Sequence, residues 1–130
     1  MSVNIKKQFG IWMDSHNAVI IGKEHIESGN FIVLGRVQAN DDESNSNEKT
    51  ANNAKRGSLQ KFFKDICSFM QNVDEVHVTG TGTAQEQFIR HLAETPQYKN
   101  ATAHESTANK MSDEKLIEYI TAKFNAELVG

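Results

Sequence analysis

The apolar residues of this chain change their spacing once, and that change constrains the fold more than any other feature of the sequence. Before residue 38 they form short alternating or β-branched runs, at 9–13, 18–22 and 31–37. Runs of this kind are typical of β-strands. Beyond residue 58, segments with helical spacing alternate with further short runs. The chain should therefore begin with three strands and continue with alternating helices and strands.

The first two runs are expected to form a β-hairpin, because the short polar segment 15–17 between them favours a turn. The continuous apolar run 31–34 is typical of a strand that is covered on both faces. Two later strands are predicted at 75–79 and 101–105.

Three helices are predicted from the apolar spacing. The first covers 58–71, where apolar residues recur at i, i+3, i+4 and i+7. The second covers 84–94, and Thr83 and Glu86 have the spacing of a capping box at its start. The third begins after Ser112, which is a suitable N-cap residue.

The predicted order of elements is βββαβαβα. Three leading strands indicate an antiparallel meander, and the later alternation indicates parallel strands added through right-handed crossovers. We therefore expect an α/β fold of three layers, in which helices flank a five-stranded mixed sheet. This order of strands and helices is that of a ribonuclease H-like core. A chain of 130 residues is expected to form one such domain, spanning 1–130.

Composition excludes several classes of protein. The single cysteine, Cys67, cannot form an internal disulfide, and an inert thiol beside the apolar face of the first helix is expected. No apolar run approaches the ~20 residues of a membrane span, and no signal peptide is visible. We therefore expect a cytoplasmic protein with no membrane partner. The net charge of -3 argues against binding nucleic acid by bulk attraction to phosphates.

The segment 38–56 is polar: its hydrophobic-class residues are three alanines, set among five asparagines, four acidic and three basic residues. This composition predicts a mobile loop, which is either functional or a neutral insertion. Lys55 and Arg56 at its end, with Lys61 just beyond, form a local concentration of positive charge. These three residues are candidate RNA contacts, and ordinary solvated charge is the alternative interpretation.

The segment Gly80-Thr81-Gly82-Thr83 links a predicted strand to a predicted helix, a junction at which backbone N–H groups can hold an anion. Gln85 stands where a dinucleotide-binding fingerprint would have its third glycine, so no nucleotide cofactor is implied. The four residues of the turn are candidate anion or ligand contacts, and His104 could line a crevice with them. The alternative is a tight turn that uses glycine for its access to positive φ.

Asp14 at the end of the first strand invites comparison with metal-dependent nucleases. That chemistry needs several converging carboxylates, and the other carboxylates in suggestive places are Glu105 and Asp113. A turn residue that bonds its own backbone is the alternative role for Asp14. No two histidines have i, i+4 spacing, so no metal site is predicted beyond this weak candidate. Structural roles are expected for the histidines, with His91 solvated on the second helix.

Three segments resemble a known family in order along the chain: Ile11–Ile20, Val78–Phe88 and Glu105–Asp113. They are similar to the middle domain of eukaryotic and archaeal class 1 peptide chain release factors and of Pelota, and closer still to small bacterial translational machinery proteins related to that domain. The resemblance implies a ribonuclease H-like fold. The Gly-Gly-Gln motif of release factors is absent, so the resemblance does not imply hydrolysis of peptidyl-tRNA.

These observations support a leading hypothesis and two alternatives. The leading hypothesis is a non-enzymatic accessory protein associated with the ribosome or with RNA. The first alternative is a metal-dependent nuclease or other hydrolase that uses Asp14 and the Gly80–Gly82 turn. The second is a small-ligand or stress module that forms a homo-oligomer through a sheet edge.

Overall fold

The computed structural model describes residues 7–23, 30–39 and 60–129 of the chain. Lys55 and Arg56, and the predicted loop beyond residue 39, lie outside these residues. The described strands and helices are β1 (Gln8–Met13), β2 (Asn17–Lys23), β3 (Phe31–Gln38), a helix at residues 60–67, β4 (Glu75–Gly80), α2 (Ala84–Glu94), β5 (Thr102–Thr107) and α3 (Asp113–Val129).

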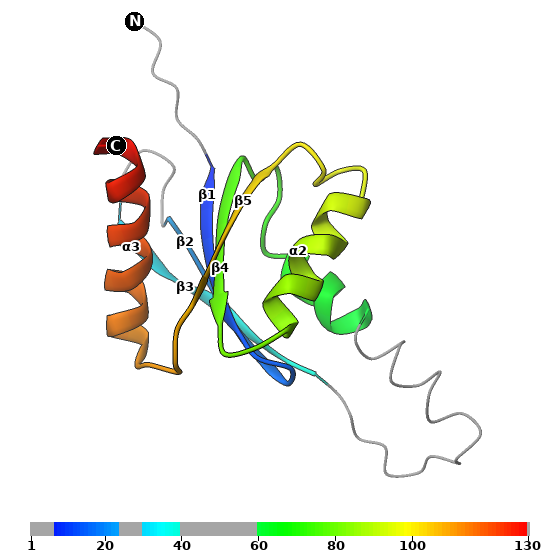
Figure 1. Ribbon diagram of the computed structural model, residues 1–130, viewed down its shortest axis with the longest axis horizontal. Coiled ribbons are helices and arrows are strands. Elements are labelled where there is room, and N and C mark those ends of the chain that lie inside the picture. Colours follow the sequence, from blue (N-terminus) through cyan, green and yellow to red (C-terminus); the bar gives the residue numbers. More distant parts are fainter. Residues whose placement is uncertain (1–6, 24–29, 40–59, 130) are drawn as a thin grey trace, which may run out of the picture.

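The five strands form one mixed sheet in the order β3-β2-β1-β4-β5 (Figure 1). β1 pairs with β2 and β2 pairs with β3 in antiparallel register, which confirms the predicted hairpin and meander. β4 joins the other side of β1 in parallel register, and β5 extends the sheet in parallel from β4. The predicted α/β architecture and the order βββαβαβα are confirmed.

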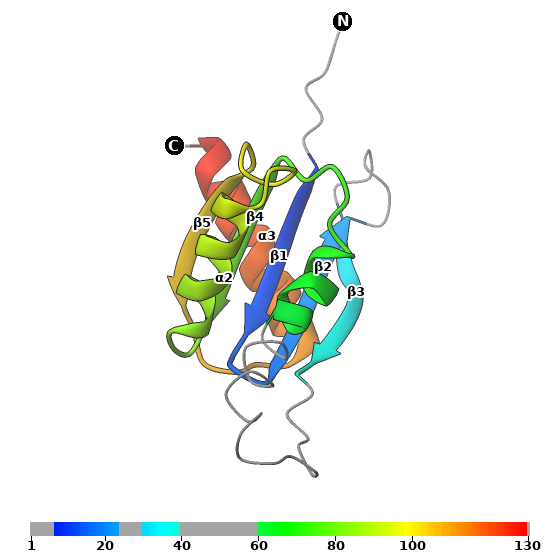
Figure 2. The same ribbon diagram turned by 90° about the vertical axis from the view of Figure 1, so that its right-hand side faces the viewer.

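Helices cover both faces of the sheet, so the fold has three layers. The helix at 60–67 and α2 lie on one face, and α3 lies on the other (Figures 1 and 2). The alternation of side chains along a strand explains why two separate cores form. In β1, Ile11 and Met13 point toward the two-helix layer, whereas Trp12 points toward α3.

The larger core, under the two-helix layer, is built from strand residues and the apolar stripes of both helices. Phe62, Ile66 and Phe88 are fully buried in it. The rings of Phe63 and Phe88 meet edge to face at 5.3 Å between centroids, a favourable geometry for aromatic pairs. The helical spacing seen in the sequence therefore marks this buried face correctly.

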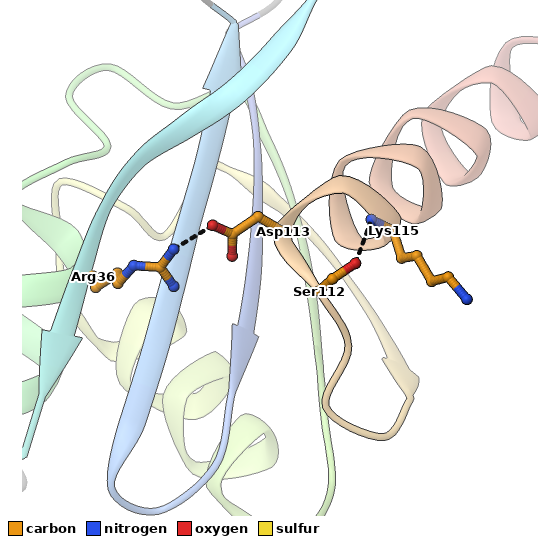
Figure 3. A network of polar contacts seen from close by, with 4 residues as sticks. All are labelled: Arg36, Ser112, Asp113 and Lys115. Carbon is orange, nitrogen blue, oxygen red and sulfur yellow. Dashed lines mark hydrogen bonds and ion pairs between the residues drawn. The ribbon is translucent and has the colours of Figure 1, made fainter.

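The smaller core packs α3 against the opposite face, through Trp12, Ile21, Phe31 and the buried stripe of the helix. The start of α3 is fixed as the sequence predicts, because the backbone N–H of Lys115 donates to the Ser112 hydroxyl at 3.3 Å. Arg36 on β3 forms an exposed ion pair with Asp113 in the first turn of the helix (Figure 3). This pair ties the edge strand to the helix start.

Two predictions about individual elements need correction. The first predicted helix ends at residue 67 rather than 71, because Phe69 and Met70 donate to carbonyls three residues back and form a tighter turn. The run 31–34 belongs to the edge strand β3, so three of its residues are only partly buried.

Among the helices that the structure describes, none has the length and apolar character needed to cross a membrane.

Candidate functional site

The three parallel strands β1, β4 and β5 end at the same edge of the sheet. Their last residues, Met13, Gly80 and Thr107, are register partners across the two strand pairs. In open α/β sheets, ligands commonly bind beyond the carboxyl ends of the strands. Asp14 directly follows β1 and the turn begins at Gly80, the last residue of β4, so the structure brings these two sequence candidates to the edge where a site is expected.

Gly80 is required at this edge because of a close approach between strands. A Cβ atom on Gly80 would lie 1.9 Å from the carbonyl oxygen of Met13 and 2.8 Å from Oε1 of Gln85. Neither Gly80 nor Gly82 has the positive φ that the sequence interpretation invoked, and nothing lies within 4 Å of the corresponding position on Gly82. The two glycines that look equivalent in the sequence therefore have different roles.

The side chain of Gln85 fills the inside of the turn. It is 1% exposed, and its Nε2 donates to the carbonyl of Ser106 at 2.8 Å and to that of Gly80 at 3.5 Å. Its Oε1 accepts a hydrogen bond from the backbone N–H of Gly82 at 3.2 Å. One side chain thus joins the end of β4, the turn and β5.

This arrangement replaces the predicted capping box. Thr83 is the N-cap residue of α2, but its side chain makes no cap hydrogen bond. The Gly82 N–H, one of the donors expected to face an anion, is already bonded to Gln85. Thr81, Gly82 and Thr83 are exposed. Ligand binding at this turn stays a prediction, but the Gly82 N–H is no longer available as a donor to the ligand.

We expect Gln85→Met to lower the free energy of unfolding by about 2 kcal/mol, because it keeps the side-chain volume but leaves the Gly82 N–H and the Ser106 carbonyl unpaired. Chemical denaturation followed by circular dichroism measures the change. Gln87→Met is the control, because Gln87 is exposed on the same helix. Equal stability of the two variants would contradict the role given to Gln85.

Asp14 has the turn role that the sequence offered as an alternative. Its Oδ1 accepts the backbone N–H groups of His16 at 2.8 Å and of Asn17 at 2.7 Å. These bonds shape the β1–β2 turn. Within residues 7–23, 30–39 and 60–129, no three or more histidine, cysteine or acidic side chains are grouped to hold a metal ion.

His104 does not lie beside the Gly80–Thr83 turn. It sits in the middle of β5, in register with His77 of β4, whereas Gly80 is in register with Thr107 at the strand end. Its Nε2 lies 3.8 Å from Oε2 of Glu75, and its ring stacks on that of His77 with 6.3 Å between centroids. This register gives no support to the predicted crevice of His104 with the turn, and ligand binding by His104 stays a prediction.

His77 belongs to a buried polar network between β4, β5 and α3. The Ser106 hydroxyl lies 2.8 Å from Nε2 of His77, 2.7 Å from the Tyr119 hydroxyl and 2.9 Å from Oγ1 of Thr79, to which it donates. A serine hydroxyl has one proton and two lone pairs. The Tyr119 hydroxyl and the His77 ring must then donate to Ser106, which places the proton of neutral His77 on Nε2.

Burial sets the charge state of His77, whose side chain is 3% exposed. Loss of solvation is the largest cause, and with smaller electrostatic contributions from Lys123 and His104 it lowers the pKa of His77 to about 4. The ring is neutral at neutral pH, and its Nδ1 is buried without a hydrogen-bond partner. The alternation in 75–79 places residue 77 opposite its valine neighbours, but the sequence does not show that α3 covers that face.

Lys61 is the one predicted RNA contact that the structure describes. It lies on the helix at 60–67 with its side chain 67% exposed, and its Nζ is 3.1 Å from Oδ2 of Asp65 one turn later. Exposed i, i+4 ion pairs of this kind contribute little to stability. The Lys61 ammonium is therefore accessible to another anionic partner.

A hollow that the sequence did not indicate lies between the helix at 60–67 and α2. His91, which the sequence interpretation placed in solvent, is half-buried there, with its ring centroid 5.3 Å from that of Phe63 and 6.3 Å from that of Phe88. Burial lowers the pKa of His91. The sequence did contain a signal for this burial: His91 follows the buried Phe88 by three residues, and residues at this spacing share a helix face.

Comparison with solved structures identifies the architecture. The chain is similar to the Pelota protein of Thermoplasma acidophilum, with 21% identity and a TM-score of 0.60, over 95% of this chain and 35% of that chain. It is also similar to Archaeoglobus fulgidus Pelota (14% identity, TM-score 0.53, 95% of this chain and 36% of that one). For an archaeal translation termination factor the values are 12% identity and TM-score 0.59, over 97% of this chain and 39% of that one.

The chain has the fold of the middle domain of Pelota and of release factors, and the predicted ribonuclease H-like architecture is confirmed. It spans less than two fifths of the length of each of these three proteins. A scan against protein-family models gives no match. No curated protein sequence matches the chain significantly.

Proposed function

We propose that the protein is a non-enzymatic accessory factor that contacts the ribosome, or RNA, through this release-factor-like domain. The observation that carries the proposal is the structural likeness to Pelota and to a translation termination factor over at least 95% of the chain. The likeness is to one part of those longer proteins. The proposal accordingly concerns docking and not the activity of a whole release factor.

The chemistry of the described residues supports a role without catalysis. The Asp14 carboxylate bonds its own turn, and the Ser106 hydroxyl has its donor and both lone pairs engaged. The Gly-Gly-Gln segment by which release factors reach the peptidyl transferase centre is absent from the sequence. Asp14, which first suggested a nuclease, thus has structural partners in its own turn.

Lys61 and its sequence neighbours supply the contact in this proposal. Its ion pair with Asp65 is exposed, so a phosphate oxygen can replace the carboxylate at small cost. Lys55 and Arg56 lie shortly before it in the sequence. Binding through a few local cations fits an overall acidic protein better than attraction to a basic surface.

Sedimentation of the purified protein with ribosomes tests this function. We expect co-migration at low salt and its loss at high salt, because contacts to phosphates release counterions. Changing Lys55, Arg56 and Lys61 together to glutamate should weaken binding by about tenfold or more. The matched control changes the exposed residues Lys99, Lys110 and Lys115 to glutamate, which alters the net charge equally.

Three results would each contradict part of the proposal. Failure to sediment with ribosomes at low salt would remove the ribosome as a partner, and failure to shift ribosomal RNA in the same buffer would remove RNA. Equal losses in the two triple variants would show that net charge and not the Lys61 region governs binding.

A further inference from the structure

The hollow between the helix at 60–67 and α2 has the volume of a small-ligand site. Its volume is about 500 Å³, within the ~300–1,000 Å³ typical of ligand pockets. Figure 2 shows the two helices on the same face of the sheet. One wall comes from residues 60–68, and the other comes from His91 of α2 and from the connection after α2. The lining residues are Gln60, Lys64, Cys67, Ser68, His91, Thr95, Gln97 and Tyr98.

The hydroxyl groups in this wall act as acceptors. Ser68 donates its proton to the carbonyl of Asp65 at 2.6 Å, and Thr95 donates to the carbonyl of His91 at 2.7 Å. Each hydroxyl has one proton, so a ligand meets only lone pairs there. The pocket therefore favours a ligand that carries N–H donors.

The charged and ring groups set the remaining requirements. Lys64 contributes an exposed ammonium, whereas burial raises the pKa of Cys67 to about 12 and also raises that of Tyr98, so both stay neutral. Burial lowers the pKa of His91, which favours the neutral ring with one donor and one acceptor. The eight lining residues include no aspartate or glutamate.

We propose that this pocket binds a nucleoside monophosphate unit with an amino-bearing base. The phosphate meets Lys64, and the exocyclic amino group donates to the hydroxyls of Ser68 and Thr95. A ligand whose N–H donors belong to an ammonium or guanidinium fits less well, because the lining offers no carboxylate to balance its charge. Divalent metal ions are disfavoured for the same reason.

The same chemistry could come from a free mononucleotide or from one nucleotide of an RNA strand. The inference stands on the pocket alone and does not need the ribosome contact at Lys61. Failure of sedimentation with ribosomes would leave it intact, and failure of nucleotide binding would leave the ribosome proposal intact. The two proposals are therefore tested separately.

Titration of the full chain with AMP, CMP, GMP and UMP, followed by two-dimensional amide NMR, tests the site. We expect shifts concentrated at residues 64–68 and 91–98, with AMP, CMP or GMP binding more tightly than UMP. Lys64→Gln should weaken binding by about tenfold, as expected for loss of one charge-assisted hydrogen bond. Arg90→Gln, an exposed change next to His91 but outside the pocket, should leave it unchanged.

A short single-stranded RNA and ribose 5-phosphate complete the experiment. Tighter binding of the RNA than of AMP identifies a strand as the source, and the reverse identifies the free nucleotide. Equal affinity for ribose 5-phosphate and for AMP would overturn the assigned recognition of a base. Absence of localised shifts with all four nucleotides and the RNA, or an unchanged affinity in Lys64→Gln, would overturn the site itself.

Discussion

Replacing Gly80 with alanine should lower the free energy of unfolding by about 3 kcal/mol or more. The added Cβ would lie 1.9 Å from the carbonyl oxygen of Met13, which is backbone and cannot turn aside. Relief requires β1 and β4 to separate at the last pair of their parallel register, where Met13 faces Gly80. The side chain of Gln85 would also be displaced from the turn, since its Oε1 lies 2.8 Å from the same Cβ position.

Gly82→Ala is the matched control, because nothing lies within 4 Å of its Cβ position and its φ is not positive. We expect this variant to unfold within about 1 kcal/mol of the parent protein. Urea denaturation followed by circular dichroism compares the two. Similar stability of both variants would show that the close approach at Gly80 does not constrain the fold.

The second large effect concerns pH. His77 has its pKa lowered from 6.5 to about 4 in the folded protein, mainly by burial. Below pH 6.5 the unfolded chain takes up a proton at this residue that the folded protein does not, so stability should fall as the pH drops from about 6.5 to 4. The full contribution is about 3 kcal/mol, present above pH 6.5 and lost by pH 4.

Urea denaturation of the parent protein and of His77→Phe between pH 4 and pH 7 measures this contribution. The phenylalanine keeps a ring beside Tyr119 and Phe124 but cannot titrate, so its stability should depend less on pH in this window. His16→Gln is the control, because His16 is exposed in the β1–β2 turn. A parent protein and His77→Phe with the same pH slope would contradict a neutral buried His77.

The sequence predicted the elements well because their signals are local. The bounds of α2 were predicted without error, as was the start of α3, whose Ser112 cap lies beside the helix it begins. The strands were predicted to within about two residues at each end. The first helix was predicted less well, because it ends four residues earlier than expected. The later resemblance to release factors and Pelota agreed with the fold that local patterns already indicated.

The candidate site was predicted less well because its determinants join distant segments. The need for Gly80 arises from Met13 on a neighbouring strand, and the bonds of Gln85 reach Ser106 on another. The position of His104 depends on the register of β5 along β4, which places it opposite His77 and not opposite Gly80. Local spacing, such as that of Thr83 and Glu86, indicated a capping box. In the structure the Gly82 N–H instead donates to Gln85, whose side chain also donates to the distant Ser106 carbonyl.

The central position of β1 also has a consequence for the order of folding. Its pairing with β2 joins residues only a few positions apart, whereas its pairing with β4 joins Gln8 to Glu75, 67 positions later. Closing the longer loop costs about 2 kcal/mol more chain entropy than closing the hairpin. We therefore expect the antiparallel meander to form first and the parallel strands to be added last. The half of the molecule that carries the Gly80 turn and α2 would then be the half that opens most readily in the native state.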